Sequence, residues 1–332
     1  MKEIITPASF KETMLKSVDP LGEALHLLRM NGMFYSRSEI IPPFGVELPA
    51  GSPFLLFHVV ISGQCWLQVK GVEPQLMKPG DFALVPHGDG HKLVSEIGFP
   101  TFNMYEVPRQ RISDRYELIT NEGDGAPSSM ICVAARFDHP AAHQLIQLLP
   151  KFIYIEAWRS PHYEWIQSTL RLMAAEAKAL RPGGETVITR LADIMVIQAI
   201  RSWIEEDPTA QTGWLGALQD KHIGNAILAI QKEPDRAWSV ATLAQEVAMS
   251  RSAFAARFKD LVEESPMQYV TRWRMNVALT WLREGDLSLT ELAERLGYQS
   301  EAAFSRAFKR AMGVSPGAAR RQAQPLNPAH LN

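Results

Sequence analysis

The stretch Leu292-Ala293-Glu294-Arg295-Leu296-Gly297-Tyr298 repeats the pattern of an earlier stretch, Leu243-Ala244-Gln245-Glu246-Val247-Ala248-Met249. Similar residues follow each copy: Phe254, Phe258 and Ser265-Pro266 after the earlier stretch, and Phe304, Phe308 and Ser315-Pro316 after the later one. The offset is about 49 residues at the front and 50 at the back, so the second copy carries one extra residue in its turn. Each copy is expected to form a helix, a tight turn and a second helix. Two such units in tandem indicate a DNA-binding module.

The composition is that of a globular chain long enough for two domains. It has 332 residues, of which 46% are hydrophobic, and a formal net charge of −2. Residues 217–321 hold 15 Lys and Arg against 12 Asp and Glu, whereas the remainder holds 19 against 24. The basic excess therefore lies in the repeat half. Two cysteines, an N-terminus without the apolar core of a signal peptide, and the lack of a long apolar run predict a soluble cytoplasmic, nucleoid-associated protein.

Residues 34–107 contain short β-like runs separated by Gly and Pro, which is typical of a small antiparallel barrel or jelly roll. Strands are expected at 54–61, 65–69, 81–86, 91–95, 101–107 and 130–137, after an opening helix from Pro20 to about Met30. The segment Gly80–His91 carries Gly, Pro, Gly and His at the spacing of the second cupin motif, with Ser95 where that motif has Asn. Residues 34–136 therefore resemble a cupin.

The resemblance implies a possible metal site. Cupin enzymes hold a metal with a His-x-His pair and a Glu of their first motif, together with the His of the second. Here the first-motif region offers only His58, while His91 matches the second motif and His87 lies nearby in sequence. Transition-metal sites need three or four ligands. We therefore predict no cofactor and no metal, with a metal at His58, His87 and His91 as the alternative. The pair His139 and His143 is more typical of a solvated or capping role than of a metal site.

A binding pocket for a small organic effector is predicted inside the barrel. Its candidate residues are Phe57, His58, Trp66, Leu84, His87 and His91. Cys65 and Cys132 are candidates for sensing an oxidant or electrophile, although inert buried thiols are the favoured interpretation. No paired carboxylates and no nucleophile with a base can be recognised, so the chain is not predicted to be an enzyme.

Two helices, at about 160–180 and 185–206, are expected to follow the barrel as a hairpin. Their apolar residues cover more than one stripe, which favours a homodimer through one face. The predicted domains are a cupin-like sensing and dimerisation domain at 1–206, a linker at 207–216, a DNA-binding domain at 217–321 and a flexible tail at 322–332. The expected fold class is thus a β jelly roll with a helical hairpin, followed by an all-α tandem helix-turn-helix.

The predicted DNA-binding residues lie on the outward face of the second helix of each unit. They are Arg251, Ser252, Ala255, Ala256, Arg257 and Lys259 in the first copy, and Glu301, Ala302, Ser305, Arg306, Lys309 and Arg310 in the second. Arg306 is placed to reach a guanine edge, whereas Lys259, Lys309 and Arg310 are suited to phosphates. Ser239 and Ser288 are expected to cap the preceding helices. A helix from Pro266 to about Glu284, roughly 27 Å long, would separate the two units by close to one turn of DNA.

With these features the last hundred residues resemble the AraC/XylS family of bacterial transcription regulators, and the cupin-like front fits its subgroup with an N-terminal effector-binding cupin. One departure concerns Ala256, because many relatives have Arg at that position, equivalent to Arg306. We therefore expect the first unit to read less sequence than the second.

The sequence predicts a sequence-specific transcription regulator, more typically an activator, controlled by a small molecule or stress signal. Its expected partners are double-stranded promoter DNA, RNA polymerase, an unknown small-molecule effector and a second copy of the chain, with no membrane. Two alternatives remain: a metal-dependent cupin enzyme fused to a DNA-binding domain, and a thiol-based regulator that senses oxidants or electrophiles.

Overall fold

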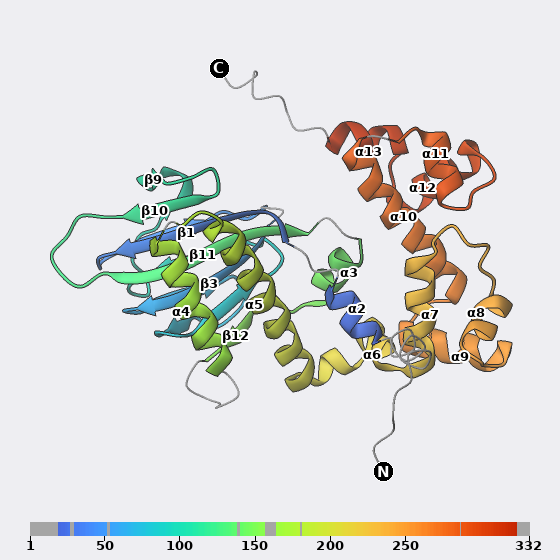
Figure 1. The fold of residues 1–332 in the computed structure, drawn as a ribbon, viewed down its shortest axis with the longest axis horizontal. Coiled ribbons are helices and arrows are strands. Elements are labelled where there is room, and N and C mark those ends of the chain that lie inside the picture. Colours follow the sequence, from blue (N-terminus) through green and yellow to red (C-terminus); the bar gives the residue numbers. More distant parts are fainter. Residues whose placement is uncertain are drawn as a thin grey trace, which may run out of the picture. The chain divides into compact units, whose positions relative to one another are not determined.

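The computed structural model describes residues 19–26, 30–51, 54–137, 140–156, 164–179, 181–285 and 287–323. The chain forms two compact units, which are described separately. The sheet unit comprises residues 28–138 and 143–206, and the helical unit comprises residues 207–332 together with 1–27 and 139–142. Figure 1 shows the strands gathered in the sheet unit and helices alone in the helical unit. The predicted fold class, a β-rich first part with a helical hairpin and an all-helical second part, is confirmed.

Two sheets form the sheet unit. One has the strand order β12-β6-β3-β11-β1-β10-β9, and the other has the order β5-β4-β7-β2-β8. The strands are β1 (Met30–Ile40), β2 (Gly45–Leu48), β3 (Leu55–Ser62), β4 (Cys65–Val69), β5 (Gln75–Met77), β6 (Phe82–Val85), β7 (His91–Val94), β8 (Phe102–Asn103), β9 (Arg109–Arg111), β10 (Tyr116–Thr120), β11 (Ser128–Phe137) and β12 (Ile153–Ile155).

The core of the sheet unit lies between the two sheets. Leu56 and Val60 of β3 pack in one cluster with Leu67 of β4 and Leu93 of β7. Side chains alternate between the two faces of a strand, so every second residue of β3 points into this core. Most neighbouring strands are antiparallel, as expected. The pairs β1–β10 and β2–β8 are parallel, however, because long connections return the chain beside an earlier strand in the same direction.

The predicted helical hairpin is α4 (Glu164–Ala179) and α5 (Gly184–Glu206), preceded by α3 (Pro140–Leu148). Both hairpin helices cover the seven-stranded sheet: α4 packs against β3, and α5 packs against β1 and β12 (Figure 1). The inner side of α5 buries an apolar set, which comprises Ile188, Ala192, Met195, Val196, Ala199, Ile200 and Ile204.

Two expected elements differ from the structure. The opening helix α2 (Pro20–His26) is shorter than expected, because Met30 already pairs with Phe137 as the first residue of β1. The strand expected at 101–107 is reduced to β8, and a 3-10 helix, η1 (Met104–Glu106), follows it. The side chain of Asn103 explains the change, since its Oδ1 accepts a hydrogen bond from the amide of Tyr105 at 3.0 Å and so caps η1.

The helical unit contains η3 (Pro208–Gln211), α6 (Gly213–Gln219), α7 (Lys221–Lys232), α8 (Val240–Glu246), α9 (Arg251–Val262), α10 (Pro266–Glu284), α11 (Leu289–Arg295), α12 (Glu301–Met312) and α13 (Pro316–Ala323). Helix α2 also packs here, against α6 and α7, and Glu23 forms an ion pair with Lys232 at 3.3 Å. Helix α2 therefore packs with the helical unit.

The segment predicted as a linker at 207–216 is instead ordered as η3 and the first half of α6, because Trp214 and Leu215 are buried in the helical unit. The helix expected from Leu218 to Gln231 is divided at Asp220. The Asp220 carboxylate accepts hydrogen bonds from the amides of His222 and Ile223 and so begins a new helix, α7. At the other end, α13 extends two residues into the predicted tail at 322–332, and the rest of that tail lies outside the described residues.

In the part of the chain that the structure describes, no helix has the length and apolar character needed to cross a membrane.

Candidate nucleic-acid interface

The same capping arrangement begins both helix-turn-helix units. In the first unit, the amide of Thr242 donates to Ser239 Oγ at 3.1 Å, and the amide of Ser239 donates to Thr242 Oγ1 at 2.8 Å. In the second, Ser288 and Glu291 exchange the equivalent bonds at 3.2 and 2.8 Å. Each pair satisfies two amides that a helix start otherwise leaves unpaired. The caps predicted at Ser239 and Ser288 are thereby confirmed.

The turns of the two units use different residues for the same backbone conformation. Gly297 has φ +71°, and the equivalent Ala248 has φ +54°. A left-handed conformation is unstrained for glycine but costs an alanine roughly 1 kcal/mol. The turns also differ in length, since α8 ends at Glu246 and α9 begins at Arg251, while α11 ends at Arg295 and α12 begins at Glu301. The extra residue predicted in the second turn is therefore present.

Two buried phenylalanines fix the orientation of each second helix. Phe254 and Phe258 of α9 are fully buried and in ring contact at 5.6 Å, and Phe304 and Phe308 of α12 are likewise buried, at 5.7 Å. Because residues four apart share one face of a helix, the opposite faces of α9 and α12 must point to solvent. The predicted core positions are confirmed, and with them the choice of outward face.

The outward face of α9 carries small residues and few basic side chains that are free to contact DNA. Arg251, Ser252, Ala256 and Lys259 are exposed, and Ala255 is half-buried. Arg257, however, forms an ion pair with Asp220: its Nε donates to Asp220 Oδ2 at 2.9 Å, and its Nη2 donates to the same oxygen. Partial burial tends to raise the pKa of Asp220, but hydrogen bonds from Arg257 and from the amides of Ile223 and His222 outweigh it, so the net pKa is lowered. Arg257 therefore supports the start of α7.

The outward face of α12 is more basic. Arg306, Lys309 and Arg310 are exposed, Ala302 is exposed beside them, and Ser305 is half-buried. Within the described residues, Arg306 forms no ion pair, so its guanidinium is available to a ligand. Glu301, at the first position of the helix, accepts a hydrogen bond from Thr290 Oγ1 at 3.0 Å. The two outward faces thus carry five exposed basic side chains, Arg251, Lys259, Arg306, Lys309 and Arg310. Among them, Arg306 is the arginine at the centre of α12, where a bidentate contact to a base edge is possible.

The long helix α10 connects the two units, as expected. It begins with a Ser265–Gln268 capping box and ends at Gly285, which has φ +91°. Its 19 residues span about 28 Å at 1.5 Å per residue. One part of α10 packs against α7 and α9 and another against α12 and α13 (Figure 1). A helix of this length holds the two outward faces at a fixed separation.

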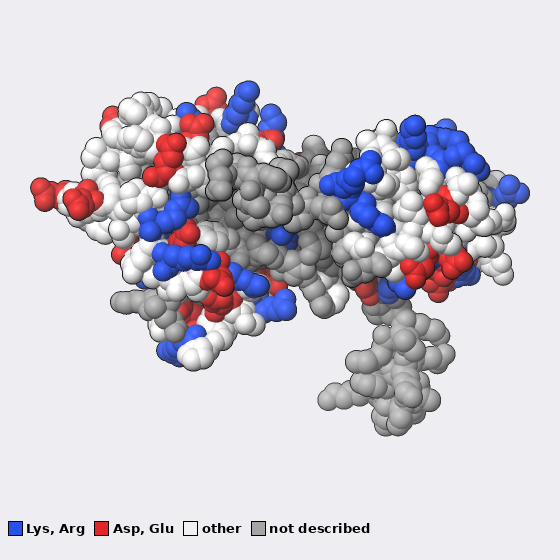
Figure 2. All heavy atoms as spheres, turned by 90° about the horizontal axis from the view of Figure 1, so that it is seen from above, with Lys and Arg blue, Asp and Glu red and all other residues white. Residues whose placement is uncertain are grey.

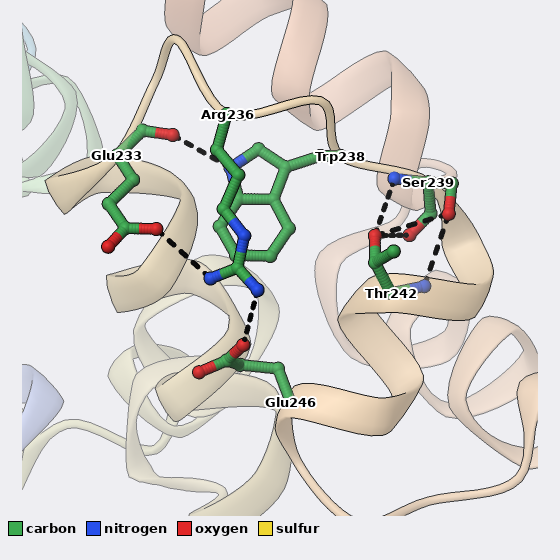
Figure 3. Close-up of polar contacts among 6 residues, drawn as sticks. All are labelled: Glu233, Arg236, Trp238, Ser239, Thr242 and Glu246. Atoms are coloured by element: carbon green, nitrogen blue, oxygen red, sulfur yellow. Dashed lines mark hydrogen bonds and ion pairs between the residues drawn. The ribbon is translucent and has the colours of Figure 1, made fainter.

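The loop between α7 and α8 adds a second connection that the sequence did not reveal. In Figure 3, the Arg236 guanidinium lies over the Trp238 ring, 4.1 Å from its centroid, and contacts Glu233 and Glu246, each at 3.0 Å. Trp238 Nε1 also donates to the Glu233 carbonyl at 2.8 Å. These contacts tie the loop to both α7 and α8.

Residues of α10 and of the second turn also contact the loop between α7 and α8. Arg274 of α10 donates to the carbonyls of Pro234 and Arg236, at 2.7 and 2.8 Å. Gly297 of the second turn approaches so closely that a Cβ there would lie 2.4 Å from the Asp235 carbonyl oxygen. Loop, α10 and second turn therefore pack as one body, which fixes the second helix-turn-helix relative to the first.

Basic side chains gather in parts of the helical unit. Figure 2 shows groups of Lys and Arg side chains along the upper edge and at the left of the right-hand, helical unit, while acidic side chains lie in the middle of the same face and towards its lower edge. Such basic groups, on a chain whose net charge is −2, are the kind of electrostatic footprint that a duplex-binding surface has.

Comparisons with known proteins agree with this geometry. A family model described as "Cupin" matches residues 19–205, and a second, described as "Helix-turn-helix domain", matches residues 243–322. A putative AraC-like transcription regulator of Streptomyces lividans is 34% identical over 302 residues, which cover 90% of this chain and 97% of the relative. The chain belongs to the AraC-like transcription regulators. The predicted family, and with it a regulator that combines a cupin sensor domain with a DNA-binding domain, is confirmed.

Further matches to this AraC-like regulator include a curated relative and two solved structures. The regulator AlkR of Acinetobacter baylyi is 30% identical over 274 residues, covering 81% of this chain and 88% of AlkR. Among solved structures, the DNA-binding domain of AdpA, determined in complex with a target DNA, is 31% identical and matches 32% of this chain and 99% of that domain, with a TM-score of 0.31. ToxT of Vibrio cholerae is 12% identical and matches 90% of this chain and 99% of its own, with a TM-score of 0.36.

The effector pocket predicted for the regulator is not a single pocket. His58 points between the sheets, whereas its neighbour Phe57 points to the opposite face of β3, where it pairs with Leu84 and contacts Phe82. His87 is engaged elsewhere, with its Nε2 2.8 Å from the Leu149 carbonyl oxygen. Trp66 is half-buried on β4 of the other sheet. The six candidates therefore do not line one pocket. Among them, His58 and His91 are the two whose ring nitrogens meet. The alternation of adjacent strand residues could have separated Phe57 from His58 in the sequence.

His58 and His91 form a buried pair whose Nε2 atoms lie 2.6 Å apart. Burial, and then the neighbouring His91, holds the pKa of His58 well below its usual value, and burial lowers the pKa of His91 to about 4. Both rings are therefore neutral at pH 7, and one Nε2–H must donate to the other Nε2. Neither Nδ1 has a hydrogen-bond partner among the residues that the structure describes.

The alternative metal site lacks a third ligand. His87 is bonded to Leu149, and nowhere in the described ranges do three His, Cys, Asp or Glu side chains lie together in a metal-binding arrangement. Two converging histidines alone do not fit the three or four ligands of a transition-metal site. His139 and the side chain of His143 lie outside the described residues. The absence of a cofactor stays a prediction.

The two cysteines are buried between the sheets. Burial raises the pKa of Cys65 to about 12, and Cys132 and Asp81 add to the shift. Burial likewise raises the pKa of Cys132 to about 12 against opposing hydrogen bonds from Ser36 and Ser38. With such a pKa only roughly one thiol in 100,000 is a thiolate at pH 7, and the thiolate is the reactive form. The geometry favours the inert interpretation.

A pocket that the sequence did not indicate opens near β2 and β8. Its volume is about 360 Å³, and its lining comes from Ile40, Pro43, Phe44, Gly45, Val46, Phe99, Phe102, Glu106, Val107, Pro108, Ile119, Thr120 and Asn121. A much smaller cavity of about 20 Å³, which His58 and Cys132 line, shares several of these residues and lies deeper. The larger pocket is of the size that small organic ligands occupy.

Proposed function

We propose that this regulator binds promoter DNA through both helix-turn-helix units, which contribute unequally. Helix α12 is the main base reader, and α9 is chiefly an anchor. The observation that carries the proposal is Arg306, an exposed arginine without a described ion pair at the centre of the outward face of α12. The equivalent residue of α9 is Ala256, which cannot form a hydrogen bond to a base. A bidentate arginine–guanine contact contributes about 1–3 kcal/mol to discrimination.

The test uses an operator identified by genome-wide mapping of the bound DNA. Binding of the full chain to that operator and to a scrambled duplex is measured by fluorescence anisotropy. We expect Arg306→Ala to weaken operator binding about 10- to 100-fold and scrambled binding much less, because only the operator offers the guanine. Arg111→Ala, an exposed arginine of the sheet unit, is the matched control and should change neither. Wild-type operator affinity in Arg306→Ala would show that α12 is misassigned.

We further propose that α4 and α5 form the dimer contact. Leu172 of α4 and Val187 and Ile194 of α5 are large apolar residues that remain exposed, at 46%, 39% and 46% of their surface. Val187 and Ile194 are seven apart and so share one helical face. A dimer would present four helix-turn-helix units to the DNA.

Membership of the AraC-like regulators supports the remaining parts of the proposal. The regulator acts in the cytoplasm on chromosomal DNA, activates transcription through a contact with RNA polymerase, and responds to a small molecule bound in the sheet unit. It performs no catalysis. Metal analysis of the purified protein separates this proposal from a cupin enzyme fused to a DNA-binding domain: stoichiometric iron, manganese or nickel would favour the enzyme. Full induction of a reporter in the double variant Cys65→Ser, Cys132→Ser would exclude thiol sensing.

A further inference from the structure

The pocket near β2 and β8 has one ionisable lining residue, Glu106. Its carboxylate forms no hydrogen bond or ion pair with any described residue, although Arg109 lies three positions away. Arg109 is committed elsewhere, because it contacts the Met104 carbonyl and the carboxylate of Glu117. Glu106 is therefore an uncompensated negative charge at the edge of an apolar pocket.

Aromatic side chains form much of the pocket wall. Phe44, Phe99 and Phe102 line it, and Phe102 keeps 63% of its surface exposed. Tyr105, beside Glu106 in η1, is 68% exposed. Neighbouring exposed apolar side chains that form one patch can mark a ligand-binding groove. The faces of aromatic rings attract cations through the ring quadrupole, and a nearby carboxylate adds to that attraction.

The pocket walls are held in place before any ligand binds. Ser95 Oγ accepts a hydrogen bond from the Phe44 amide at 2.9 Å and donates to the Phe44 carbonyl at 3.2 Å. The side-chain amide of Asn121 bonds to both the amide and the carbonyl of Ile41, at 2.6 and 2.8 Å. Gly45 lies so close to the next loop that a Cβ would fall 2.3 Å from the Pro100 carbonyl oxygen. Preformed walls reduce the ordering that binding would otherwise cost.

The bonds to Ile41 fix the orientation of the Asn121 amide and use one of its two N–H groups and one lone pair of its oxygen. Apart from Glu106 and the rest of this amide, the lining presents the Thr120 hydroxyl, backbone groups and apolar surface. Such a lining suits neither a sugar, which needs many hydrogen-bonding partners, nor an anion, which Glu106 would repel.

We propose that the effector of this regulator is a hydrophobic organic cation, with an aromatic or alkyl body against Phe44, Phe99 and Phe102 and an ammonium group beside Glu106. Only the role of this cation as an effector rests on the proposed function, because its binding can be measured without DNA. The site differs from the interior group around His58 and His91 that the sequence suggested.

The test titrates the full chain at 0.15 M salt with (2-naphthylmethyl)trimethylammonium, read by the fluorescence anisotropy of the naphthalene. Its neutral isostere, in which carbon replaces the quaternary nitrogen, and the anion 2-naphthylmethanesulfonate are the comparison probes. We expect Glu106→Gln to weaken binding of the ammonium about five- to tenfold, because the variant keeps the shape and removes the charge. Binding of the neutral isostere should stay within about twofold.

Two further variants complete the design. Glu73→Gln removes an exposed carboxylate in the loop between β4 and β5, at the opposite edge of the five-stranded sheet from β8, and should leave both affinities unchanged. Phe102→Ala, at a largely exposed position, should weaken both the ammonium and the neutral probe because it removes pocket wall. Equal binding of the sulfonate, an unchanged ammonium affinity in Glu106→Gln, or no ammonium binding by the wild type would overturn the proposal. Operator binding by the same preparation separates this failure from failure of the DNA-binding proposal.

Discussion

At the scale of single residues, the two reading helices differ in what they offer to DNA. Lys259 and Lys309 occupy equivalent exposed positions on α9 and α12, so each unit keeps one lysine of the kind that neutralises phosphates. Arg306 and Ala256 occupy the other equivalent position and differ completely in hydrogen-bonding ability. Both units therefore carry the proposed phosphate contact, whereas only α12 carries the proposed base reader.

This argument predicts the behaviour of Lys259→Ala. Loss of one phosphate contact should weaken binding to operator and scrambled DNA by a similar factor, and the slope of log affinity against log salt should fall by about one. Anisotropy titrations at four salt concentrations measure both effects. Lys70→Ala, an exposed lysine of the sheet unit, serves as control. A loss confined to the operator would instead make Lys259 a base reader.

The buried histidine pair predicts how the sheet unit responds to acid. The folded pKa values of His58 and His91 lie below the ordinary 6.5, so the unfolded chain takes up protons that the folded chain refuses. Stability is therefore unaffected above about pH 6.5 and falls as the pH drops towards 4, by about 1.4 kcal/mol per pH unit for each histidine. Thermal unfolding of the full chain between pH 8 and 5 should show this decline.

Two variants test that the pair is the cause. In the double variant His58→Leu, His91→Leu, which replaces both partners by apolar residues, the decline should be markedly smaller. In His26→Gln, which alters an exposed histidine of the helical unit, the decline should persist. A full acid decline in the double variant would assign the effect to other groups.

At the scale of elements, exchange of Gly and Ala should affect the free energy of unfolding differently in the two turns. Gly297→Ala should destabilise the protein by more than about 2 kcal/mol, since the residue has φ +71° and its Cβ would lie 2.4 Å from the Asp235 carbonyl oxygen. Ala248→Gly should stay within about 0.5 kcal/mol, because relief of the left-handed conformation is offset by greater freedom of the unfolded chain. Urea unfolding compares the two variants directly, and equal effects would contradict the assignment.

The elements that the sequence predicted correctly are those whose cause is local. Ser239, Ser288 and Ser265-Pro266 begin helices through bonds to residues three positions away, and Gly297 makes its turn through its own backbone. Each of these signals lies within a few residues of the helix start or turn that it determines, so it can be recognised from the sequence alone.

What the sequence did not predict depends on residues that meet only in the folded chain. Asp220 and Arg257 are 37 positions apart. Because Arg257 forms an ion pair with Asp220, its guanidinium is not simply free to contact DNA. The pocket unites Phe44 with Glu106 because β2 and β8 lie side by side, a parallel pairing that the expected antiparallel barrel did not include. The loop at Asp235, which Arg274 and Gly297 grip, has no local signal at all.

At the scale of the whole molecule, the separation of reading heads depends on two different connections. Within one copy, α10 and the loop held by Arg274 make the two helix-turn-helix units a single rigid reader. Between two copies, the proposed contact through α4 and α5 would act only by keeping a second reader close. In this proposal, the connection within one copy determines which sequence is recognised, and the contact between copies determines how strongly a repeated site is bound.

The dimer proposal therefore predicts a selective defect in the double variant Leu172→Glu, Ile194→Glu. Charges on this apolar face should give a monomer in sedimentation velocity while the fold is retained, because both side chains keep 46% of their surface exposed in one copy. Tethering of two readers raises affinity for a repeated site by about 10² to 10⁴, so the variant should lose that factor on a two-site operator and none on a single half-site. The substitution Gln167→Glu, at an exposed position of α4, controls for added charge on the hairpin. A variant that stays dimeric, or that weakens both DNAs equally, would place the dimer contact elsewhere.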